Sequence, residues 1–284
     1  MKKLLIVGGN GYLGNKLKNY LENKHYKVDH TSRKGSNGAI KFDLVEPKSI
    51  LKLDLQSYDT AFISAAISSP DICTNEFEYA WKVNVTHTAE LINLLLRKGL
   101  KIIFFSSDTV YGEQIEPFDE SINCKPLGKY ALMKRQIEEM FQQSDHFKAI
   151  RLSYVFSKND KFTKYLLDVS SRGETAEVFH PLSRSVIYVD DVLEGVKNIS
   201  ENWENINSTF INFGGNQNLS RIDFANIIKK NYLRNLKFIE MNPNDSFFES
   251  RARIINMNSP ILKEILKRDT FNFAKAVEKE FLSK

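Results

Sequence analysis

The N-terminal region carries the feature that most restricts the fold of this chain, a glycine-rich loop between an apolar run and an amphipathic segment. Residues 4–7 are apolar, as expected of a buried parallel strand, and residues 12–23 gather leucines on one helical face. Between them stand Gly8, Gly11 and Gly14. Glycines let the backbone turn tightly and approach a pyrophosphate, while the following helix N-terminus supplies N–H donors. The loop predicts a dinucleotide site, although three spaced glycines are also compatible with a plain turn.

Strand-like and helix-like segments alternate through the first half of the chain. The predicted strands cover residues 4–7, 26–31, 40–42, 60–64, 101–105 and 147–152. The predicted helices cover residues 12–23, 80–97 and 130–143. Strands that alternate with helices of this length form parallel sheets with helices on both faces. We therefore expect an α/β fold with a doubly wound parallel sheet of the Rossmann type.

Beyond about residue 156 the elements become shorter. Stretches typical of loops occur at 157–160, 212–218 and 242–246. We expect a cofactor-binding domain over 1–156 and a smaller C-terminal substrate lobe over 157–284. A helix is predicted at 189–199, and we expect segment 186–200 to pack back on the first domain.

Composition and charge argue against several classes of protein. The hydrophobic share of 42% and the charged share of 26% are ordinary for a globular chain. The net charge of +5 is spread along 284 residues, so nucleic-acid binding is not expected. Cys73, Cys124 and the five histidines lack the spacing of a metal site. No apolar run could span a membrane, and glycines interrupt the first run too early for an export signal, so we expect a cytoplasmic protein.

Ser32 and Arg33 follow the second predicted strand, where an acidic residue would bind the adenosine ribose of NAD. A carboxylate would repel a 2′-phosphate, whereas a hydroxyl and a guanidinium would bind one. The pair predicts NADP, with NAD as the alternative cofactor and a solvated loop arginine as the plain alternative for Arg33. Asp43, after the third strand, is a candidate acceptor for the adenine amino group or a simple turn former.

Tyr130 and Lys134 lie four residues apart on a predicted helix, so their side chains share one face. Tyrosine, with an ordinary pKa of about 10, is a poor proton donor near neutrality, and we expect the ammonium to lower that pKa. Ser107, at the end of the fifth strand, could donate a hydrogen bond to the same reacting oxygen. Together they predict proton transfer beside a nicotinamide, although most such Tyr/Lys pairs are structural.

These features together resemble the extended short-chain dehydrogenase/reductase family, whose members act mainly on nucleotide sugars. The resemblance covers nearly the whole chain. The matching segments are Val7-Gly8-Gly9-Asn10-Gly11-Tyr12-Leu13-Gly14, Ala65-Ala66, Asn84-Val85 with Thr88, Phe105-Ser106-Ser107-Asp108-Thr109-Val110-Tyr111-Gly112, Tyr130 with Lys134, and Arg184-Ser185-Val186-Ile187-Tyr188-Val189-Asp190-Asp191.

The resemblance implies a role for each matching residue. Those implied to be catalytic are Ser107, Tyr130 and Lys134. Those implied to bind the cofactor are Gly8, Asn10, Gly11, Tyr12, Leu13, Gly14, Ser32, Arg33, Asp43, Leu44, Ala65, Ala66, Asn84, Tyr130 and Lys134. Those implied to bind a nucleotide-sugar substrate are Ser68, Ser107, Arg184 and Arg251, the arginines holding its diphosphate. An ion pair with Asp191 is the plain alternative for Arg184, and an ordinary polar helix residue is the alternative for Asn84.

The residues after Ser107 distinguish reactions within the family that the chain resembles. Sugar 4,6-dehydratases carry Thr-Asp-Glu and fucose-synthase-type enzymes a cysteine at the third position, whereas this chain has Ser107-Asp108-Thr109. The Ser-Thr-Asp-Tyr-Val-Phe segment of 4-dehydrorhamnose reductases is more similar. The leading hypothesis is NADPH-dependent reduction of a 4-keto nucleotide sugar for surface polysaccharide synthesis. The alternatives are an NAD-dependent 4-epimerase and a non-catalytic NADP-binding regulatory subunit.

Members of this family often dimerise through the helices expected here at 80–97 and 130–143, so a homodimer is expected. The apolar residues that could form this face, or equally pack in the core, are Trp81, Leu91, Leu94 and Leu95.

Overall fold

The computed structural model describes residues 3–282, which divide into two compact units. The first unit comprises residues 3–110, Gly128–Arg151 and Val196–Ile211. The second comprises Tyr111–Leu127, Leu152–Gly195 and residues 212–282. Each unit therefore draws on segments that are distant in the sequence.

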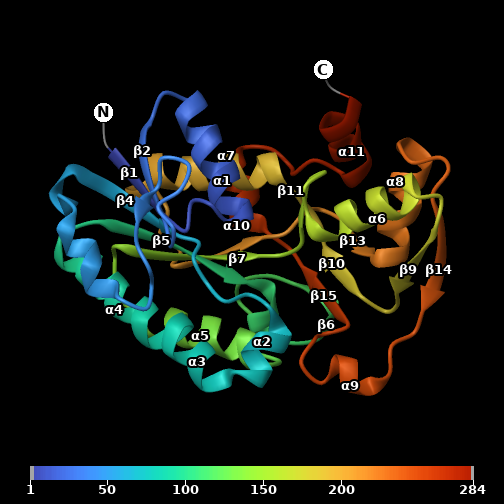
Figure 1. Cartoon of the computed structure of the whole chain (residues 1–284), viewed down its shortest axis with the longest axis horizontal. Helices are drawn as coiled ribbons and strands as arrows, with labels where there is room; N and C mark the ends of the chain where they lie inside the picture. The colour runs from blue at the N-terminus through green and yellow to red at the C-terminus, as the bar shows by residue number, and fades with distance from the viewer. Residues whose placement is uncertain (1–2, 283–284) are drawn as a thin grey trace. The chain divides into compact units, whose positions relative to one another are not determined.

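The first unit is built on a sheet that has seven strands among the described residues, in the order β12-β7-β5-β4-β1-β2-β3 (Figure 1). The strands are β1 (Lys3–Val7), β2 (Lys27–Ser32), β3 (Ile40–Lys41), β4 (Tyr58–Ile63), β5 (Lys101–Ser107), β7 (Phe147–Leu152) and β12 (Phe210–Phe213). The pairings from β3 through β2, β1 and β4 to β5 are parallel. The predicted Rossmann-type doubly wound fold is confirmed. The chain order reverses between β1 and β4, the place where such sheets bind ligands beyond their strand ends.

The predicted strands agree closely with the observed ones. All six coincide with β1 to β5 and β7, with ends that differ by at most two residues. β1 shows why, since Leu4 to Val7 are at most 2% exposed and both faces of the strand are covered. Strand β12 was not predicted, because four residues are too few to show an alternation of apolar and polar side chains. It lies beside β7, where the Ala149 N–H donates to the Thr209 carbonyl (2.8 Å).

Helices cover both faces of this sheet (Figure 1). Helix α1 (Tyr12–Asn23) lies on one face, and α4 (Thr88–Arg97) and α5 (Lys129–Phe141) lie on the other. Shorter helical segments of the same unit are α2 (Pro70–Asn75), α3 (Phe77–Trp81) and the 3-10 turns Pro47–Lys52, Leu55–Ser57 and Trp203–Asn205. The bounds of α1 are those predicted from its leucine spacing.

The helix predicted over 80–97 is interrupted. A π turn at Lys82–His87 separates α3 from α4. Thr88 Oγ1 donates to the Val83 carbonyl (2.9 Å), a partner five residues earlier. Such wider turns shift the helical phase and occur frequently at functional sites. Here the turn carries Asn84, whose contacts are described below.

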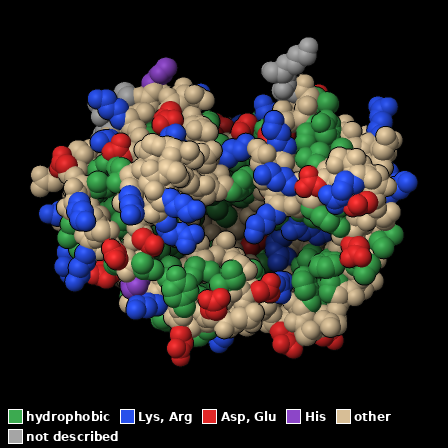
Figure 2. Space-filling model, viewed as in Figure 1, with side chains coloured by type: hydrophobic (Ala, Val, Ile, Leu, Met, Phe, Trp, Pro, Cys, Tyr) green, Lys and Arg blue, Asp and Glu red, His purple; other side chains and the backbone are tan. Residues whose placement is uncertain are grey.

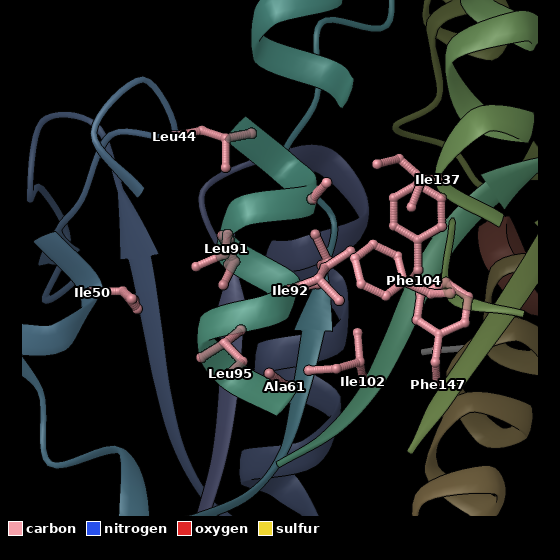
Figure 3. Packing of buried hydrophobic residues seen from close by; sticks show 14 of the residues in the cluster. Leu44, Ile50, Ala61, Leu91, Ile92, Leu95, Ile102, Phe104, Ile137 and Phe147 are labelled. Carbon is pink, nitrogen blue, oxygen red and sulfur yellow. The ribbon is translucent and has the colours of Figure 1, made fainter. Parts of the chain in front are cut away.

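A core of apolar side chains fills the space between α4 and the sheet (Figure 3). Its members include Leu91, Ile92 and Leu95 of α4 with Ala61, Ile102, Phe104 and Phe147 of the sheet. Leu91 and Leu95 are fully buried, so they belong to this core and not to a dimer face. Trp81 and Leu94 are partly buried against the same cluster.

The second unit, within the described residues, has a four-stranded sheet in the order β13-β10-β15-β6 and the strand pairs β11-β8 and β14-β9. Its strands are β6 (Gln114–Phe118), β8 (Val155–Phe156), β9 (Thr175–Phe179), β10 (Ser183–Ser185), β11 (Ile187–Tyr188), β13 (Asn218–Ser220), β14 (Lys237–Met241) and β15 (Ile254–Met257). Its helices are α6 (Lys161–Ser171), α8 (Arg221–Asn231), α9 (Asp245–Phe248), α10 (Pro260–Leu266) and α11 (Phe273–Leu282). Helix α7 (Val189–Glu201), predicted at 189–199, passes from the second unit into the first.

Aromatic side chains form much of the second unit's interior. The ring of Phe156 lies 5.7 Å from that of Phe224 and 4.8 Å from that of Phe273. Of the predicted loops, 157–160 has no regular structure, whereas 242–246 includes the start of α9. No helix in residues 3–282 combines the length and apolar character needed to cross a bilayer. Figure 2 shows Lys and Arg side chains interspersed with Asp and Glu on the visible face.

Leu95→Ala should lower the free energy of unfolding by about 2–5 kcal/mol, because it leaves a cavity in the core between α4 and the sheet. Urea denaturation would measure the change. Leu94→Ala is the matched control, since Leu94 is only partly buried, and it should cost clearly less. Equal losses at the two positions would contradict the assignment of Leu95 to the core.

Candidate active site

The glycine loop closes around the segment that follows β4. Gly8 has a φ of +91°, and its N–H donates to Oγ1 of Thr31 on β2 (3.3 Å). A Cβ at Gly8 would lie 2.8 Å from the Ala65 nitrogen, and a Cβ at Gly14 would lie 2.4 Å from the Gly8 carbonyl oxygen. Neither approach is sterically possible, so both positions require glycine. The loop is therefore a bare-backbone cradle between the ends of β1 and β4.

The first turn of α1 leaves backbone donors without side-chain caps. Its N-cap is Gly11, which makes no side-chain cap hydrogen bond, and the turn contains no acidic residue. The N–H groups of Tyr12 and Leu13 thus stand at the positive end of the helix dipole, where an anion is stabilised. Asn10 instead ties the loop to its surroundings, because its Nδ2 donates to Ser36, at 3.2 Å to the carbonyl and 3.3 Å to Oγ.

The residues expected to select NADP lie at the end of β2, of which Ser32 is the last residue. Ser32 Oγ accepts from the Gly35 N–H (3.1 Å), which leaves the hydroxyl proton available to a ligand. Arg33 is exposed, and no carboxylate in residues 3–282 forms an ion pair with it. An exposed guanidinium beside an available hydroxyl could bind a phosphate group.

Asp43 and Leu44 have local structural roles. Asp43 Oδ1 accepts from the Val45 N–H (3.1 Å), and the Asp43 carbonyl accepts from the Glu46 N–H (3.0 Å). One carboxylate oxygen of Asp43 therefore stabilises a turn, which is the turn-forming role considered for this residue from the sequence. The Leu44 side chain is buried in the core, so only its backbone could face a ligand.

Asn84 holds the segment after β4 through both backbone polar groups of one residue, Ile67. Its Oδ1 accepts from the Ile67 N–H (2.8 Å), and its Nδ2 donates to the Ile67 carbonyl (2.8 Å). The Cys73 thiol donates to the same carbonyl (3.3 Å). Because Ile67 directly follows Ala65 and Ala66, these bonds fix the small-residue segment beside the glycine loop. Asn84 is thus not an ordinary polar helix residue. The role of Cys73 was missed, because a lone cysteine carries no sequence pattern that would predict it.

Ser107 is oriented by the two residues that follow it. Its hydroxyl donates to Asp108 Oδ1 (3.3 Å) and accepts from Thr109 Oγ1 (2.9 Å) and the Thr109 N–H (3.3 Å). From the sequence, Thr109 served only to distinguish reactions within the family, and its role in holding Ser107 was missed. The sequence feature that could have predicted this role is the threonine hydroxyl two residues after Ser107. Ser68, the other candidate from a loop, is exposed.

Tyr130 and Lys134 lie one turn apart on α5, as the spacing predicts. Lys134 Nζ is 5.7 Å from the centroid of the Tyr130 ring. The same ammonium donates to the Phe105 carbonyl (2.7 Å) and lies 4.4 Å from the centroid of the Phe104 ring. The side chain of Lys134 therefore joins α5 to the end of β5, one strand residue before the serines.

Burial dominates the ionisation of both side chains. It raises the pKa of Tyr130, and the neighbouring Cys73 and Asp108 raise that pKa further. Burial lowers the pKa of Lys134 to about 8 against the opposing effect of the Glu138 carboxylate. The expectation that Lys134 lowers the pKa of Tyr130 is therefore wrong for this arrangement, because the ammonium is directed at a carbonyl rather than at the phenol.

The two candidate arginines belong to the second unit. Arg184 donates through Nη1 to the carbonyls of Ser183 (2.7 Å) and Arg253 (3.2 Å). Its Nη2 donates to the Ala252 carbonyl (2.8 Å). Arg251 Nη1 donates to the Phe247 carbonyl (3.3 Å).

The alternative for Arg184, an ion pair with Asp191, does not form. Asp191 pairs with Arg268 (2.7 Å). Within the part of the chain that the structure describes, no three His, Cys, Asp or Glu side chains gather to hold a metal ion.

A model of the NAD dependent epimerase/dehydratase family matches residues 4–214. The matched region contains every motif on which the resemblance to extended short-chain dehydrogenases rests, from Gly8 to Asp191. That resemblance is confirmed. Arg251 lies beyond the matched region.

Curated relatives are similar over most of their length. The chain is 26% identical to UDP-glucuronic acid decarboxylase 5 of Arabidopsis thaliana over 86% of this chain and 79% of that one. It is 25% identical to ADP-L-glycero-D-manno-heptose-6-epimerase of Brachyspira hyodysenteriae over 81% of both chains.

Solved structures share the fold. A hypothetical dTDP-4-dehydrorhamnose reductase from Sulfolobus tokodaii superposes with a TM-score of 0.84 at 22% identity, over 97% of this chain and 99% of that one. A UDP-glucose-4-epimerase from Stenotrophomonas maltophila, with bound NAD and formylated UDP-arabinopyranose, superposes with a TM-score of 0.85 at 16% identity, over 99% and 96%.

Lys134→Met should change the pH dependence of stability. Because burial holds the pKa of Lys134 at about 8 in the folded state, below the ordinary 10.5, the unfolded chain binds more protons between these values. The burial cost of the ammonium is therefore full below pH 8 and is relieved as the pH rises. The free energy of unfolding of the variant minus that of the wild type should fall by about 2 kcal/mol between about pH 7 and pH 9.5.

Urea titrations at several pH values would measure this difference. Lys129→Met, at an exposed lysine of the same helix, controls for the general loss of a positive charge. A difference that does not change with pH would show that the Lys134 ammonium is not destabilised by burial.

Proposed function

This chain belongs to the NAD-dependent epimerase/dehydratase family, and on that premise we propose that it transfers hydride between a nicotinamide dinucleotide and a nucleotide sugar. The observation that carries the proposal is that one compact unit holds both a bare-backbone cradle after β1 and the Tyr130–Lys134 pair, whose ammonium binds the strand that ends at Ser107. The curated relatives, an epimerase and a decarboxylase of nucleotide-linked sugars, support the same substrate class.

The glycine cradle fits a dinucleotide. Side chains at Gly8 or Gly14 would collide with neighbouring backbone, so that surface stays bare for close approach by a pyrophosphate. The uncapped N-terminus of α1 would stabilise the negative charge of the pyrophosphate. Ala65 and Ala66, held through Ile67, would line the cradle from the β4 side. When bound, the nicotinamide supplies or accepts the hydride.

The side chains at the end of β5 and on α5 handle the proton. Tyr130 exchanges a proton with the sugar oxygen at the reacting carbon. Lys134, whose ammonium also donates to the Phe105 carbonyl, would bind the cofactor ribose. The Ser107 hydroxyl, oriented by Thr109, would turn its proton from Asp108 Oδ1 to the same sugar oxygen when the substrate binds. The raised pKa keeps Tyr130 protonated near neutrality, which is the form that reduction needs, but it also makes the phenol a weaker acid.

For the direction of reaction, we favour reduction of a 4-keto nucleotide sugar with NADPH for surface polysaccharide synthesis. A reductase takes up fresh reduced cofactor in each turnover, and the exposed Arg33 beside Ser32 suits the 2′-phosphate of NADPH. Thr109 stands where an acid for elimination would be needed, so a dehydratase is disfavoured. The second candidate is an NAD-dependent epimerase, which the epimerases among the relatives favour.

The two candidates differ in cofactor handling. With NADPH and a dTDP- or GDP-linked 4-keto-6-deoxyhexose, a reductase should consume NADPH in proportion to sugar product. An epimerase should instead retain NAD(H) through desalting and interconvert sugar epimers without net oxidation. Spectrophotometry and chromatography of the sugar nucleotides would decide between them. Absence of both activities over a panel of nucleotide sugars would overturn the proposed function.

Tyr130→Phe should abolish most turnover, by about 100-fold or more, because it removes the proton that the sugar oxygen receives. Its affinity for NADPH should remain within a few-fold of wild type, since the phenol ring is kept. Steady-state kinetics and NADPH fluorescence would measure the two effects. Full activity in this variant would exclude Tyr130 as the proton donor.

Arg33→Ala should raise the KM for NADPH by about tenfold through loss of a charge-assisted phosphate contact. The KM for NADH serves as the internal control and should hardly change, because NADH lacks the 2′-phosphate. Equal effects on the two cofactors would remove the argument for NADP.

A further inference from the structure

Glu138 on α5 is a buried carboxylate at the centre of a hydrogen-bond cluster. It is fully buried, and its Oε1 accepts from Ser106 Oγ (2.6 Å) and Arg151 Nε (3.1 Å). Its Oε2 accepts from Arg151 Nη2 (2.7 Å) and Arg135 Nη1 (3.1 Å). Arg151 lies on β7 and is itself only 2% exposed. The proposed reaction gives none of these four residues a part.

The cluster is placed so that it acts on the site. Glu138 follows Lys134 by four residues, and it binds Ser106 while Lys134 binds the carbonyl of Phe105. Two successive turns of α5 are thus bonded to two successive residues of β5. The next residue of the strand is Ser107, and the preceding turn of the helix carries Tyr130. The two bonds therefore fix how α5 is aligned along the end of β5.

We propose that Glu138 is a positioning residue, which aligns α5 with the end of β5 through Ser106 and keeps the neighbouring Lys134 ammonium charged. The inference rests on the proposed function of Tyr130, Lys134 and Ser107. Glu138 itself is buried behind the reacting groups and acts through Lys134.

The charges around Lys134 support an electrostatic role. Glu138 and Tyr130 from α5 and Cys73 from α2 are the titratable neighbours, and Glu138 opposes the effect of burial on the ammonium. Strand β5 adds an uncharged carbonyl and a Phe ring. Behind Glu138 lie the cations Arg151 and Arg135. Without the Glu138 charge, the ammonium would lose the carboxylate that now lies between it and the buried Arg151 guanidinium.

A structural role alone does not explain this choice of residues. Buried ion pairs cost desolvation energy, and apolar residues of similar volume are often equally stabilising in such places. The Glu138 carboxylate contacts Ser106, the residue before Ser107, and two cations. Its negative charge can stabilise the Lys134 ammonium, which an apolar residue cannot do.

The test measures the charge of Lys134 directly. Carbon-13 NMR of labelled lysine ε-methylenes, with the Lys134 signal assigned by its loss in Lys134→Met, should show titration near the value of about 8 set by burial. In Glu138→Gln the midpoint should fall by about one pH unit or more. Glu139→Gln is the matched control, because Glu139 is the next residue, is half exposed and also pairs with Arg135 (2.9 Å). Its midpoint should stay near that of the wild type.

A second variant keeps the test decisive if Glu138→Gln does not fold. Arg135→Gln removes a partly exposed cation beside Glu138, so the Lys134 midpoint should rise. Unchanged midpoints in Arg135→Gln and in a folded Glu138→Gln would overturn the electrostatic role. The titration needs neither substrate nor cofactor, so it stands even if the proposed reaction is wrong.

Ser106→Ala tests the alignment separately, because it removes the bond to the strand and keeps every charge. In the oxidoreductase assay it should lower kcat by about tenfold through misplacement of Tyr130, with the Lys134 midpoint retained. A folded variant with wild-type kcat would overturn the alignment role.

Discussion

The close approach of Gly8, Gly14 and Ala65 is the constraint on which the rest of the first unit depends. At this point β1 ends, α1 begins and the chain leaves β4, and a single added methyl at Gly14 would meet the Gly8 carbonyl at 2.4 Å. The absence of side chains lets three backbone segments converge, and it leaves the uncapped helix N-terminus bare. The Asn84 and Cys73 bonds to Ile67, and the π turn that carries Asn84, hold the third of these segments in place.

The second part of the site is set by a balance between burial and charge. The spacing of the two residues suggested that Lys134 would lower the pKa of Tyr130. Instead, the ammonium donates to the Phe105 carbonyl. Burial raises the pKa of Tyr130 and lowers that of Lys134, so it favours the uncharged form of both side chains. Under the proposed function, a lysine that is costly to bury is retained because it acts on the reacting groups. Its stability cost and its proposed function have the same origin, since a desolvated ammonium acts strongly on whatever anion forms beside it.

Much of the fold was readable from the sequence because its signals are local. The leucine spacing predicted the bounds of α1, and the strand-like segments of the first half predicted six strands of the main sheet to within two residues. The break between α3 and α4 was not readable, since the π turn is supported by a partner five residues away and by Asn84, which binds a distant loop. In the site, residue types selected the candidates, whose roles remain predictions. Residue types did not reveal that a carboxylate oxygen of Asp43 accepts a hydrogen bond within its own turn, or that Thr109 orients Ser107.

The late position of β12 in the chain has a consequence for synthesis. The main sheet takes its last strand from Phe210–Phe213, long after β7 at Phe147–Leu152 has been made. While the ribosome adds the intervening residues, β7 is an edge strand with unpaired backbone groups, the kind of surface that recruits other chains. Vectorial folding of this protein therefore includes an interval in which the unfinished sheet edge is exposed, and chaperone binding to nascent chains should be greatest for lengths that end before β12.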